Sequence, residues 1–318
     1  MQTKSSGGEV SPPTPQALEL VDKTAKPVFS PALNSTALVP AGALPLIDVP
    51  RVPMLSREQF LEEHVRPGTP VVLTGFGHDW PAMQKWTPAY FRERFGNRRV
   101  MAVTTTKQAR GHAGHYGVPV EMSMNEYLDA VIEKDEDLRL AARHTAEIAG
   151  ELVDDFTRPD LGRGYSDDLL WLFLGSKGSR TPLHFDFGPF HVFHTIFFGE
   201  KTMHLFPQRE GRNLHQLPLT ARSKVDPLRP DTARFPRLAN IHGWRATFGR
   251  GETLFLPAGC WHDAYYHSAS LALTLRFTED ARFVKSRVLY RLGIGAISGV
   301  LEALAPDRWP ALQERLAR

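Results

Sequence analysis

A short histidine-rich stretch of the chain carries side chains that bind metal ions. Residues 181–201 read TPLHFDFGPFHVFHTIFFGEK, in which His184 and Asp186 lie two positions apart. In a β-strand, side chains two positions apart point to the same face, so this imidazole and this carboxylate would lie side by side. With a histidine from another strand they would form a 2-His-1-carboxylate set, which leaves three coordination positions open on Fe(II). The pattern predicts a metal site suited to oxygen chemistry.

The third ligand is predicted in a second stretch, GETLFLPAGCWHDAYYHSASLALTLRF, at residues 251–277. There a strand ends in Pro-Ala-Gly, and the bulky pair Cys260–Trp261 comes directly before His262. A His-x-Asp pair alone is a weak signal, because a chain with 13 histidines and 35 acidic residues contains such pairs by chance. The turn and the aromatic wedge before His262 make the signal more specific, since they fix the direction of the imidazole.

Three ordered motifs resemble those of the JmjC and cupin-like Fe(II)/2-oxoglutarate oxygenases. They are GSKGSRTPLHFD at residues 175–186, GEKTMHLFP at 199–207 and PAGCWH at 257–262, in the order of the family. The connecting segment SKVDPLRPDTARFPRLA also looks like the loop that such proteins place between the two halves of the site. The resemblance covers roughly residues 45–280, and three ordered motifs are far more specific than one.

The resemblance implies Fe(II) as the cofactor and 2-oxoglutarate as the cosubstrate. Carried over residue by residue, it makes His184, Asp186 and His262 the iron ligands. Lys201 would pair with the distal carboxylate of 2-oxoglutarate, and Thr181 would hydrogen-bond to the same group. A buried ammonium group is costly unless an anion meets it, and a dicarboxylate supplies that anion. The alternative is that Lys201 reaches solvent from the end of its strand.

Three further residues are candidates for cosubstrate binding. His194 stands where many members of the family have an amide, and its ring could face the cosubstrate, a water or a substrate. Its alternative is an ordinary core histidine. Arg276, on the predicted strand 268–277, is a competing partner for a carboxylate, with a place on the exposed surface as its alternative. Thr274 lies two residues before it and completes the set of candidates.

Two neighbours of these residues are expected to lie away from the metal. Asp263 follows His262 directly, so a regular strand would turn its carboxylate toward solvent or another partner. His191 lies three residues before His194 and is expected on the opposite face of the strand, in contact with the surface or a flexible lip. The segments 186–193 and 103–120 are expected to line the entrance, because Gly-rich connections commonly carry selectivity.

The predicted activity is the hydroxylation of a protein or peptide side chain with O2, which releases succinate and CO2. The resemblance implies this, because family members with a compact layout and helical flanks often modify polypeptides. A small-molecule hydroxylase of secondary metabolism uses the same chemistry and is the first alternative. A cupin-fold binding module without turnover is the second, although degenerate members lose a ligand and this chain keeps all three.

The elements around these motifs predict a mainly β fold with flanking helices. Capping boxes at Ser56 and Ser123 and the pair Thr87–Pro88 predict three helix starts. After residue 165, aromatic and β-branched runs bounded by Gly, Pro and Ser predict short, mostly antiparallel strands. We therefore expect a cupin-like double-stranded β-helix, or jelly roll, with a helical N-terminal flank over residues 45–282. Residues 1–44 predict a disordered tail, and residues 283–318 a C-terminal helical segment.

Composition narrows the expected partners. The 318 residues carry a formal charge of +3 without a basic run interleaved with aromatics, so nucleic acid is not an expected partner. No apolar stretch predicts a membrane span. The single cysteine, Cys260, excludes an internal disulfide and is typical of the cytoplasm. Gly295 and Gly299 share one face of the predicted C-terminal helix and favour a homodimer, with packing on the chain's own barrel as the alternative.

Overall fold

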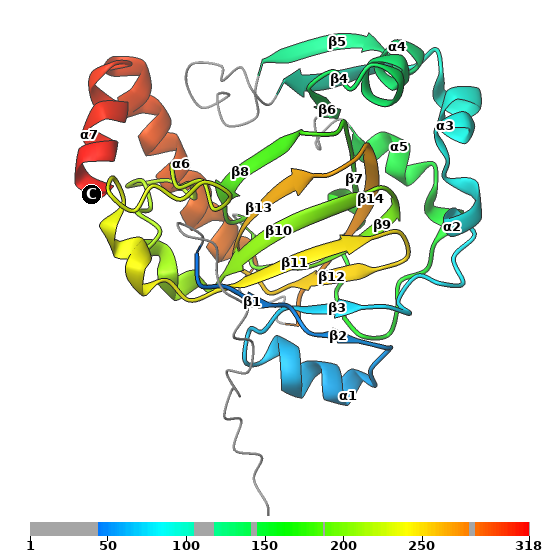
Figure 1. Cartoon of the computed structure of the whole chain (residues 1–318), viewed down its shortest axis with the longest axis horizontal. Helices are drawn as coiled ribbons and strands as arrows, with labels where there is room; N and C mark the ends of the chain where they lie inside the picture. Colours follow the sequence, from blue (N-terminus) through cyan, green and yellow to red (C-terminus); the bar gives the residue numbers. More distant parts are fainter. Residues whose placement is uncertain (1–43, 105–117, 141–144, 187, 280–283, 318) are drawn as a thin grey trace, which may run out of the picture. The chain divides into compact units, whose positions relative to one another are not determined.

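The computed structural model describes residues 44–104, 118–140, 145–186, 188–279 and 284–317 (Figure 1). Two sheets form its β core. The smaller sheet has the strand order β1 (Ile47–Asp48), β11 (Trp244–Gly249), β10 (Glu200–Phe206), β13 (Trp261–Tyr266) and β8 (Arg180–His184). Its pairs are antiparallel apart from β1 with β11, which are parallel. Of the expected tail, residues 1–44, all but Leu44 lie outside the described residues, and Leu44 is buried.

The larger sheet carries the remaining strands. Its order is β2 (Arg51–Val52), β3 (Val71–Leu73), β12 (Thr253–Leu256), β9 (His191–Phe198), β14 (Ser270–Phe277), β7 (Trp171–Gly175), β6 (Leu138–Leu140), β4 (Arg99–Thr104) and β5 (Pro119–Ser123). All of its pairs are antiparallel except β2 with β3. The expected mainly β, jelly-roll core with flanking helices is confirmed (Figure 1).

An apolar interior lies between the two sheets. Met203 and Phe248 from the smaller sheet pack there with Ile196 and Leu254 from the larger one. Because side chains alternate along a strand, the neighbouring residues of the larger sheet point the other way. Phe197, next to Ile196, belongs instead to the core that the larger sheet shares with the N-terminal helices. The strands β9, β10, β13 and β14 therefore each present every second residue to the interior.

Short helices cover the outer face of the larger sheet. They are α1 (Arg57–Phe60), α2 (Ala82–Lys85), α3 (Pro88–Phe95), α4 (Met124–Leu128) and α5 (Ala146–Gly150). The capping boxes at Ser56 and Ser123 are both formed, and the Thr87 hydroxyl accepts the Tyr90 N–H at the start of α3. After α1 and α4 the chain continues as π-helical turns at Leu61–Val65 and Asp129–Glu133. The three predicted helix starts are confirmed.

Two helices follow the β core, α6 (Val284–Leu304) and α7 (Arg308–Ala317). The second one packs on the chain itself. Gln313 donates a hydrogen bond to the Pro218 carbonyl, and Glu314 forms ion pairs with Lys224 and Arg234. Within the described part of the chain, every helix is too short or too polar to span a bilayer.

The strands β4, β5 and β6 are among those of the larger sheet that were not predicted. They pair with one another and reach β7 through Arg139 opposite Gly175. Short edge strands carry little periodicity, so their existence depends on a partner far along the chain. Of the expected entrance segment 103–120, residues 103–104 lie in β4 and 119–120 in β5. The remainder between 105 and 117 lies outside the described residues.

Candidate metal centre

His184 and Asp186, two positions apart in the sequence, meet the distant His262 in the fold. One ligand atom each of His184, Asp186 and His262 lies within 4.8 Å of the other two. The His184 Nε2 atom is 3.7 Å from the Asp186 Oδ1 atom, and the rings of the two histidines have centroids 4.3 Å apart. The predicted convergence of two imidazoles and one carboxylate is therefore present in the fold.

Backbone carbonyl groups fix the orientation of both imidazoles. The Nδ1 atom of His184 lies 2.8 Å from the Pro182 oxygen, and that of His262 lies 3.0 Å from the Cys260 oxygen. An Nδ1–H that donates to a carbonyl leaves Nε2 as the donor atom for a metal. Burial, followed by the charge of His262, lowers the pKa of His184 to about 3, so this imidazole is neutral near pH 7. Two imidazoles and one carboxylate fit Fe(II).

The pairing of β8 with β13 places the two histidines together. His184 lies directly opposite His262 in the ladder, and Thr181 lies opposite Ala264. A register shift separates these two pairs, so β8 contains one more residue than β13 between them. In a regular strand Thr181 and His184 would face opposite sides, but Ala264 belongs to the interior cluster. The bulge therefore turns Thr181 to the same interior face as the metal ligands.

Arg276 lies against the carboxylate of the centre rather than on the surface. Its side chain is 5% exposed and its guanidinium lies 3.4 Å from the Asp186 Oδ2 atom. It also donates to the Thr274 hydroxyl at 2.7 Å and lies 4.0 Å from the centre of the Trp171 ring. Burial would raise the pKa of Asp186, but the Arg276 charge, then the two histidines, lower it to about 2. The exposed-surface alternative for Arg276 is wrong.

Lys201 lies inside the barrel, and its reach to solvent is excluded by an exposure of 0%. Its Nζ atom is 3.4 Å from the His194 Nε2 atom and 4.1 Å from the centre of the Tyr266 ring. No carboxylate of the described residues forms an ion pair with it. Burial, followed by the Arg139 charge, holds the pKa of Lys201 well below its usual range. Among the described residues, this ammonium group therefore has no anion to offset the cost of its burial.

The remaining cosubstrate candidates divide into two groups. His194 is buried against Phe173 and Phe248 and contacts Lys201, so it lines the same space as the lysine. Burial, followed by the Lys201 charge, holds the pKa of His194 well below its usual range. Thr274, by contrast, is occupied by Arg276 and by the Trp171 carbonyl.

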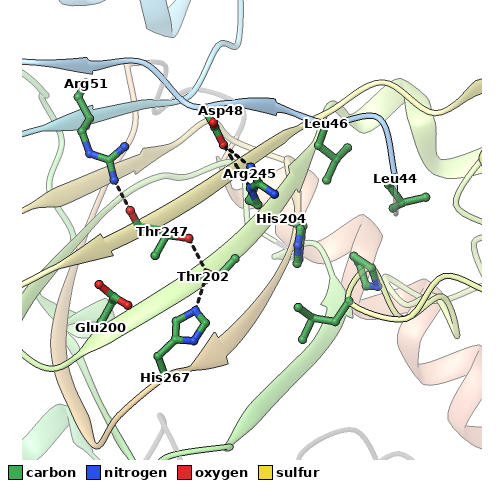
Figure 2. A pocket seen from close by; sticks show the side chains of 12 residues that line it. Leu44, Leu46, Asp48, Arg51, Glu200, Thr202, His204, Arg245, Thr247 and His267 are labelled. Carbon is green, nitrogen blue, oxygen red and sulfur yellow. Dashed lines mark hydrogen bonds and ion pairs between the residues drawn. The ribbon is translucent and has the colours of Figure 1, made fainter. Parts of the chain in front are cut away.

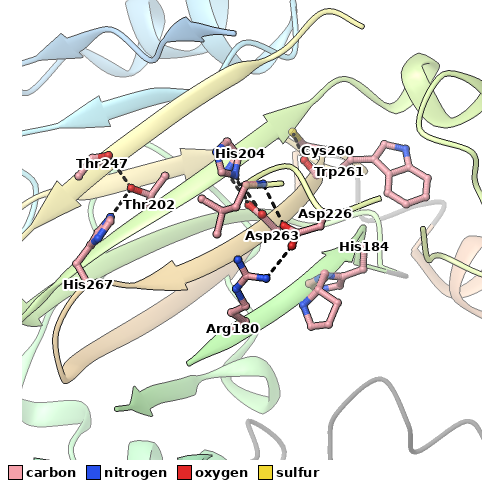
Figure 3. A network of polar contacts seen from close by, with 12 residues as sticks. Arg180, His184, Thr202, His204, Asp226, Thr247, Cys260, Trp261, Asp263 and His267 are labelled. Atoms are coloured by element: carbon pink, nitrogen blue, oxygen red, sulfur yellow. Dashed lines mark hydrogen bonds and ion pairs between the residues drawn. The ribbon is translucent and has the colours of Figure 1, made fainter. Parts of the chain in front are cut away.

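Asp263 points away from the metal, as predicted, and its partner is a second histidine. Its carboxylate accepts the backbone N–H of His204 at 2.8 Å and lies 3.0 Å from the Nδ1 atom of the same residue (Figure 3). Thr202 contacts Thr247 and His267 on that outer face. These residues border a cavity of about 570 Å³ outside the barrel, with Leu44 and Leu46 at one end (Figure 2). This cavity is separate from the metal centre.

His191 faces away from the interior, as predicted, and is partly exposed. Its ring stacks on Phe255 and Phe277, with centroids 5.6 and 5.1 Å apart. The Ala258 N–H donates to its Nδ1 atom. Burial lowers the pKa of His191 to about 4. The ring therefore packs on an aromatic cluster while part of the residue stays exposed.

Comparison with known proteins places this site in a family. The sequence profile of the cupin-like domain matches residues 57–281, which is most of the chain. The chain belongs to the JmjC/cupin-like family. Members of this family use Fe(II) and 2-oxoglutarate, and the His184–Asp186–His262 group gives this member a place for the metal.

Relatives in the family are distant in sequence. Lysine-specific demethylase 8 of Xenopus tropicalis is 26% identical over 251 residues, 75% of this chain and 55% of that protein. Lysine-specific demethylase JMJ30 of Arabidopsis thaliana is 30% identical over 230 residues, 70% of this chain and 52% of that protein. The human bifunctional peptidase and (3S)-lysyl hydroxylase JMJD7 is 26% identical over 288 residues, which are 79% of this chain and 88% of that protein. The chain thus spans about half the length of several family relatives.

Three residues of this family site were not found from the sequence. The Trp171 ring makes a cation–π contact with the Arg276 guanidinium, and the Tyr266 ring makes one with the Lys201 ammonium. Arg139 is a third buried cation near them. Tyr266 and Trp171 could have been recognised from the alternation of their strands, since they share a face with His262 and Phe173. Arg139 lies in a three-residue strand, where alternation is too short to give a signal.

Proposed function

We propose that the chain is an Fe(II)- and 2-oxoglutarate-dependent dioxygenase that hydroxylates a side chain of a protein or peptide. His184, Asp186 and His262 hold the iron, and Lys201 binds the distal carboxylate of 2-oxoglutarate, with Thr181 and His194 beside it. The observation that carries this proposal is the meeting of a facial ligand set with a buried lysine that has no carboxylate partner among the described residues. The relatives include a protein named as a lysyl hydroxylase, which supports a polypeptide substrate.

Each residue has a separate task in this reaction. Bound Fe(II) supplies the coupling of 2-oxoglutarate decarboxylation by O2, which gives succinate and CO2, to the hydroxylation of one substrate C–H bond. The carbonyls of Pro182 and Cys260 hold the two imidazoles with Nε2 toward the centre. Arg276 engages the Oδ2 atom of Asp186 and keeps this carboxylate ionised. The aromatic walls Trp171, Phe173 and Phe248 exclude water from the cosubstrate.

A small-molecule hydroxylase of the same chemistry remains the first alternative, and a binding module without turnover the second. Anaerobic titration with Fe(II) and 2-oxoglutarate separates the enzymes from the module. An enzyme gives the weak visible charge-transfer band of the iron–oxoacid chelate, and a His262→Ala variant loses it. If the wild-type protein gives no band, both enzyme readings are wrong. Succinate release with a peptide library, compared with a metabolite panel, then separates the two enzymes.

We also propose a homodimer through the C-terminal helices and a cytoplasmic location. Leu289, Ile297, Val300 and Leu304 are all exposed and form one stripe along α6. Gly295 lies on another face of the helix, where an added Cβ would meet nothing within 4 Å. The stripe therefore supports a contact with a second copy better than the glycines do. Cys260 is a buried free thiol, in keeping with a reducing compartment.

A further inference from the structure

A second buried cation, Arg139, lies on the interior side of the larger sheet. Leu138 and Leu140, its neighbours in β6, both pack into the core under the N-terminal helices. Strand alternation therefore turns Arg139 to the opposite face, and its partner across the ladder is Gly175. Gly175 shares that face with Phe173, which packs against the interior cluster. The Arg139 side chain thus enters the space between the sheets.

The missing side chain of Gly175 makes room for this arginine. A Cβ built on Gly175 would lie 3.1 Å from the Arg139 Cβ and 2.9 Å from the Tyr266 ring. Lys201 also contacts the Tyr266 ring, and its ammonium lies 4.1 Å from the centre of that ring. Arg139, Tyr266 and Lys201 therefore form one continuous cluster around Gly175. Any larger residue at position 175 would separate its members.

Both cations are buried without a counter-charge from the residues that the structure describes. Arg139 is 4% exposed and Lys201 is 0% exposed. No carboxylate of the described chain forms an ion pair with either, and the Nε atom of Arg139 has no hydrogen-bond partner. Arg139 also contributes, after burial, to the lowered pKa of Lys201, so the two groups share one interior of low polarity. Two like charges in such a place destabilise the empty protein and favour an anionic ligand.

We infer that Arg139 and Lys201 together bind the terminal carboxylate of a dicarboxylic cosubstrate, with Gly175 providing the space and Tyr266 the wall. This inference rests on the proposed function for the identity of the cosubstrate, but the anion site itself requires no metal. A guanidinium presents two parallel N–H groups to a carboxylate, so Arg139 fixes the orientation of the anion as well as its charge. Arg139 is therefore a binding residue that selects a charged terminus over an amide or an ester.

The inference predicts two measurable effects of replacing Arg139: a lower affinity for the dicarboxylate and a higher Tm of the ligand-free protein. Replacing Arg139 with a neutral residue removes charge-assisted hydrogen bonds, so the affinity for the dicarboxylate falls by about 10- to 100-fold. The same replacement removes an unpaired buried charge, so the Tm of the ligand-free protein rises. A purely structural arginine predicts a lower Tm and an unchanged affinity.

The experiment compares wild type with Arg139→Gln and Arg139→Met, and uses Arg245→Gln as the control. Arg245 is an exposed cation paired with Asp48 on the outer face of the smaller sheet, so its variant loses the same charge outside the interior (Figure 2). The first measurement is the Kd of glutarate for metal-free protein by calorimetry. The second is the Kd of 2-oxoglutarate for the anaerobic Fe(II) protein by the charge-transfer band. The third is the ligand-free Tm.

The expected result is a rise of at least about tenfold in the glutarate Kd for both Arg139 variants, with wild-type affinity for Arg245→Gln. Unchanged glutarate affinity in a folded Arg139 variant overturns the inference, and so does a wild-type protein that binds no glutarate. If the wild type binds glutarate through Arg139 but gives no chelate band with Fe(II), the proposed oxygenase fails while the anion site stands. The two ideas therefore fail separately.

Discussion

Arg276 sets the orientation of the Asp186 carboxylate at the proposed metal centre. Its guanidinium reaches Asp186, Thr274 and the Leu169 carbonyl and lies over the Trp171 ring. These contacts fix the arginine, and the arginine in turn fixes one oxygen of the carboxylate. Partners of metal ligands of this kind tune affinity, because they set both the orientation and the charge of the ligand.

Arg276→Gln is therefore expected to weaken Co(II) or Fe(II) binding by about 10- to 100-fold in the absence of 2-oxoglutarate. The measurement is an anaerobic metal titration followed by d–d absorption of Co(II). Arg99→Gln, which removes an exposed cation paired with Glu121, is the matched control. Normal metal affinity together with a raised Kd for 2-oxoglutarate would assign Arg276 to the cosubstrate instead.

His191 gives the protein a stability that depends on pH. Its pKa of about 4 in the folded state lies below the ordinary 6.5, so between these values the unfolded chain binds the proton more strongly. The contribution is complete above pH 6.5 and is lost as the pH falls toward 4. Each unit corresponds to about 1.4 kcal/mol, so acidification from 6.5 to 5 removes about 2 kcal/mol.

His191→Phe keeps a ring among Phe255 and Phe277 and removes the titration. The free energy of unfolding, measured with urea at pH 7 and pH 5, is expected to fall less with acid in the variant, by about 2 kcal/mol. His242→Phe removes an exposed imidazole and serves as the control. An identical loss in His191→Phe and wild type would show that the pKa of His191 is the same in the folded and unfolded chain.

At the scale of elements, the bulge between β8 and β13 sets which side chains of β8 face the metal centre. The ladder between β10 and β13 joins Leu205 to His262 and Thr202 to Tyr265, and between them Asp263 accepts the backbone N–H of His204. The carboxylate takes the place of a strand carbonyl at the point where the register changes. It also holds the His204 ring on the outer face, one residue from the metal ligand (Figure 3).

Asp263→Ala is expected to lower the free energy of unfolding by about 1–3 kcal/mol, because a buried N–H loses its acceptor. It is also expected to weaken metal binding, since β13 loses its anchor beside His262. Urea unfolding and a Co(II) titration measure the two effects. His267→Gln alters an exposed member of the same face as a control. Full metal affinity in a destabilised Asp263→Ala protein would limit the aspartate to folding.

At the scale of the whole chain, one contact joins the two sheets at the site. His194 comes from β9 of the larger sheet and Lys201 from β10 of the smaller one, and they meet at 3.4 Å. Only six residues separate them in sequence, because the turn at Gly199 carries the chain from one sheet to the other. A backbone φ of +79° and an added Cβ only 2.2 Å from the Ala269 oxygen explain the glycine there.

The exposed stripe of α6 predicts the assembly of the chain. Ile297→Asp together with Val300→Asp places two charges in the proposed interface, so the dimer is expected to dissociate at micromolar concentration. Light scattering coupled to size exclusion measures the mass. Met54→Asp changes an exposed apolar residue of the N-terminal part as the control. A wild-type mass equal to one chain would contradict the proposed homodimer.

The sequence by itself predicted the meeting of His184, Asp186 and His262, the burial of Lys201 and the class of fold. The metal and cosubstrate roles of these residues stay predictions. Residues two positions apart in one strand share a face of the sheet. The three ordered motifs and the capping boxes are also local patterns, which can be recognised without knowing which distant residues they contact. Only the tertiary structure decided which cations enter the interior. Arg139, the pairing of Arg276 with Asp186 and the aromatic site of His191 arise from strands distant in sequence. The burial and the charge environment of these side chains depend on residues that are neighbours in space but distant in sequence, so the sequence alone does not identify them.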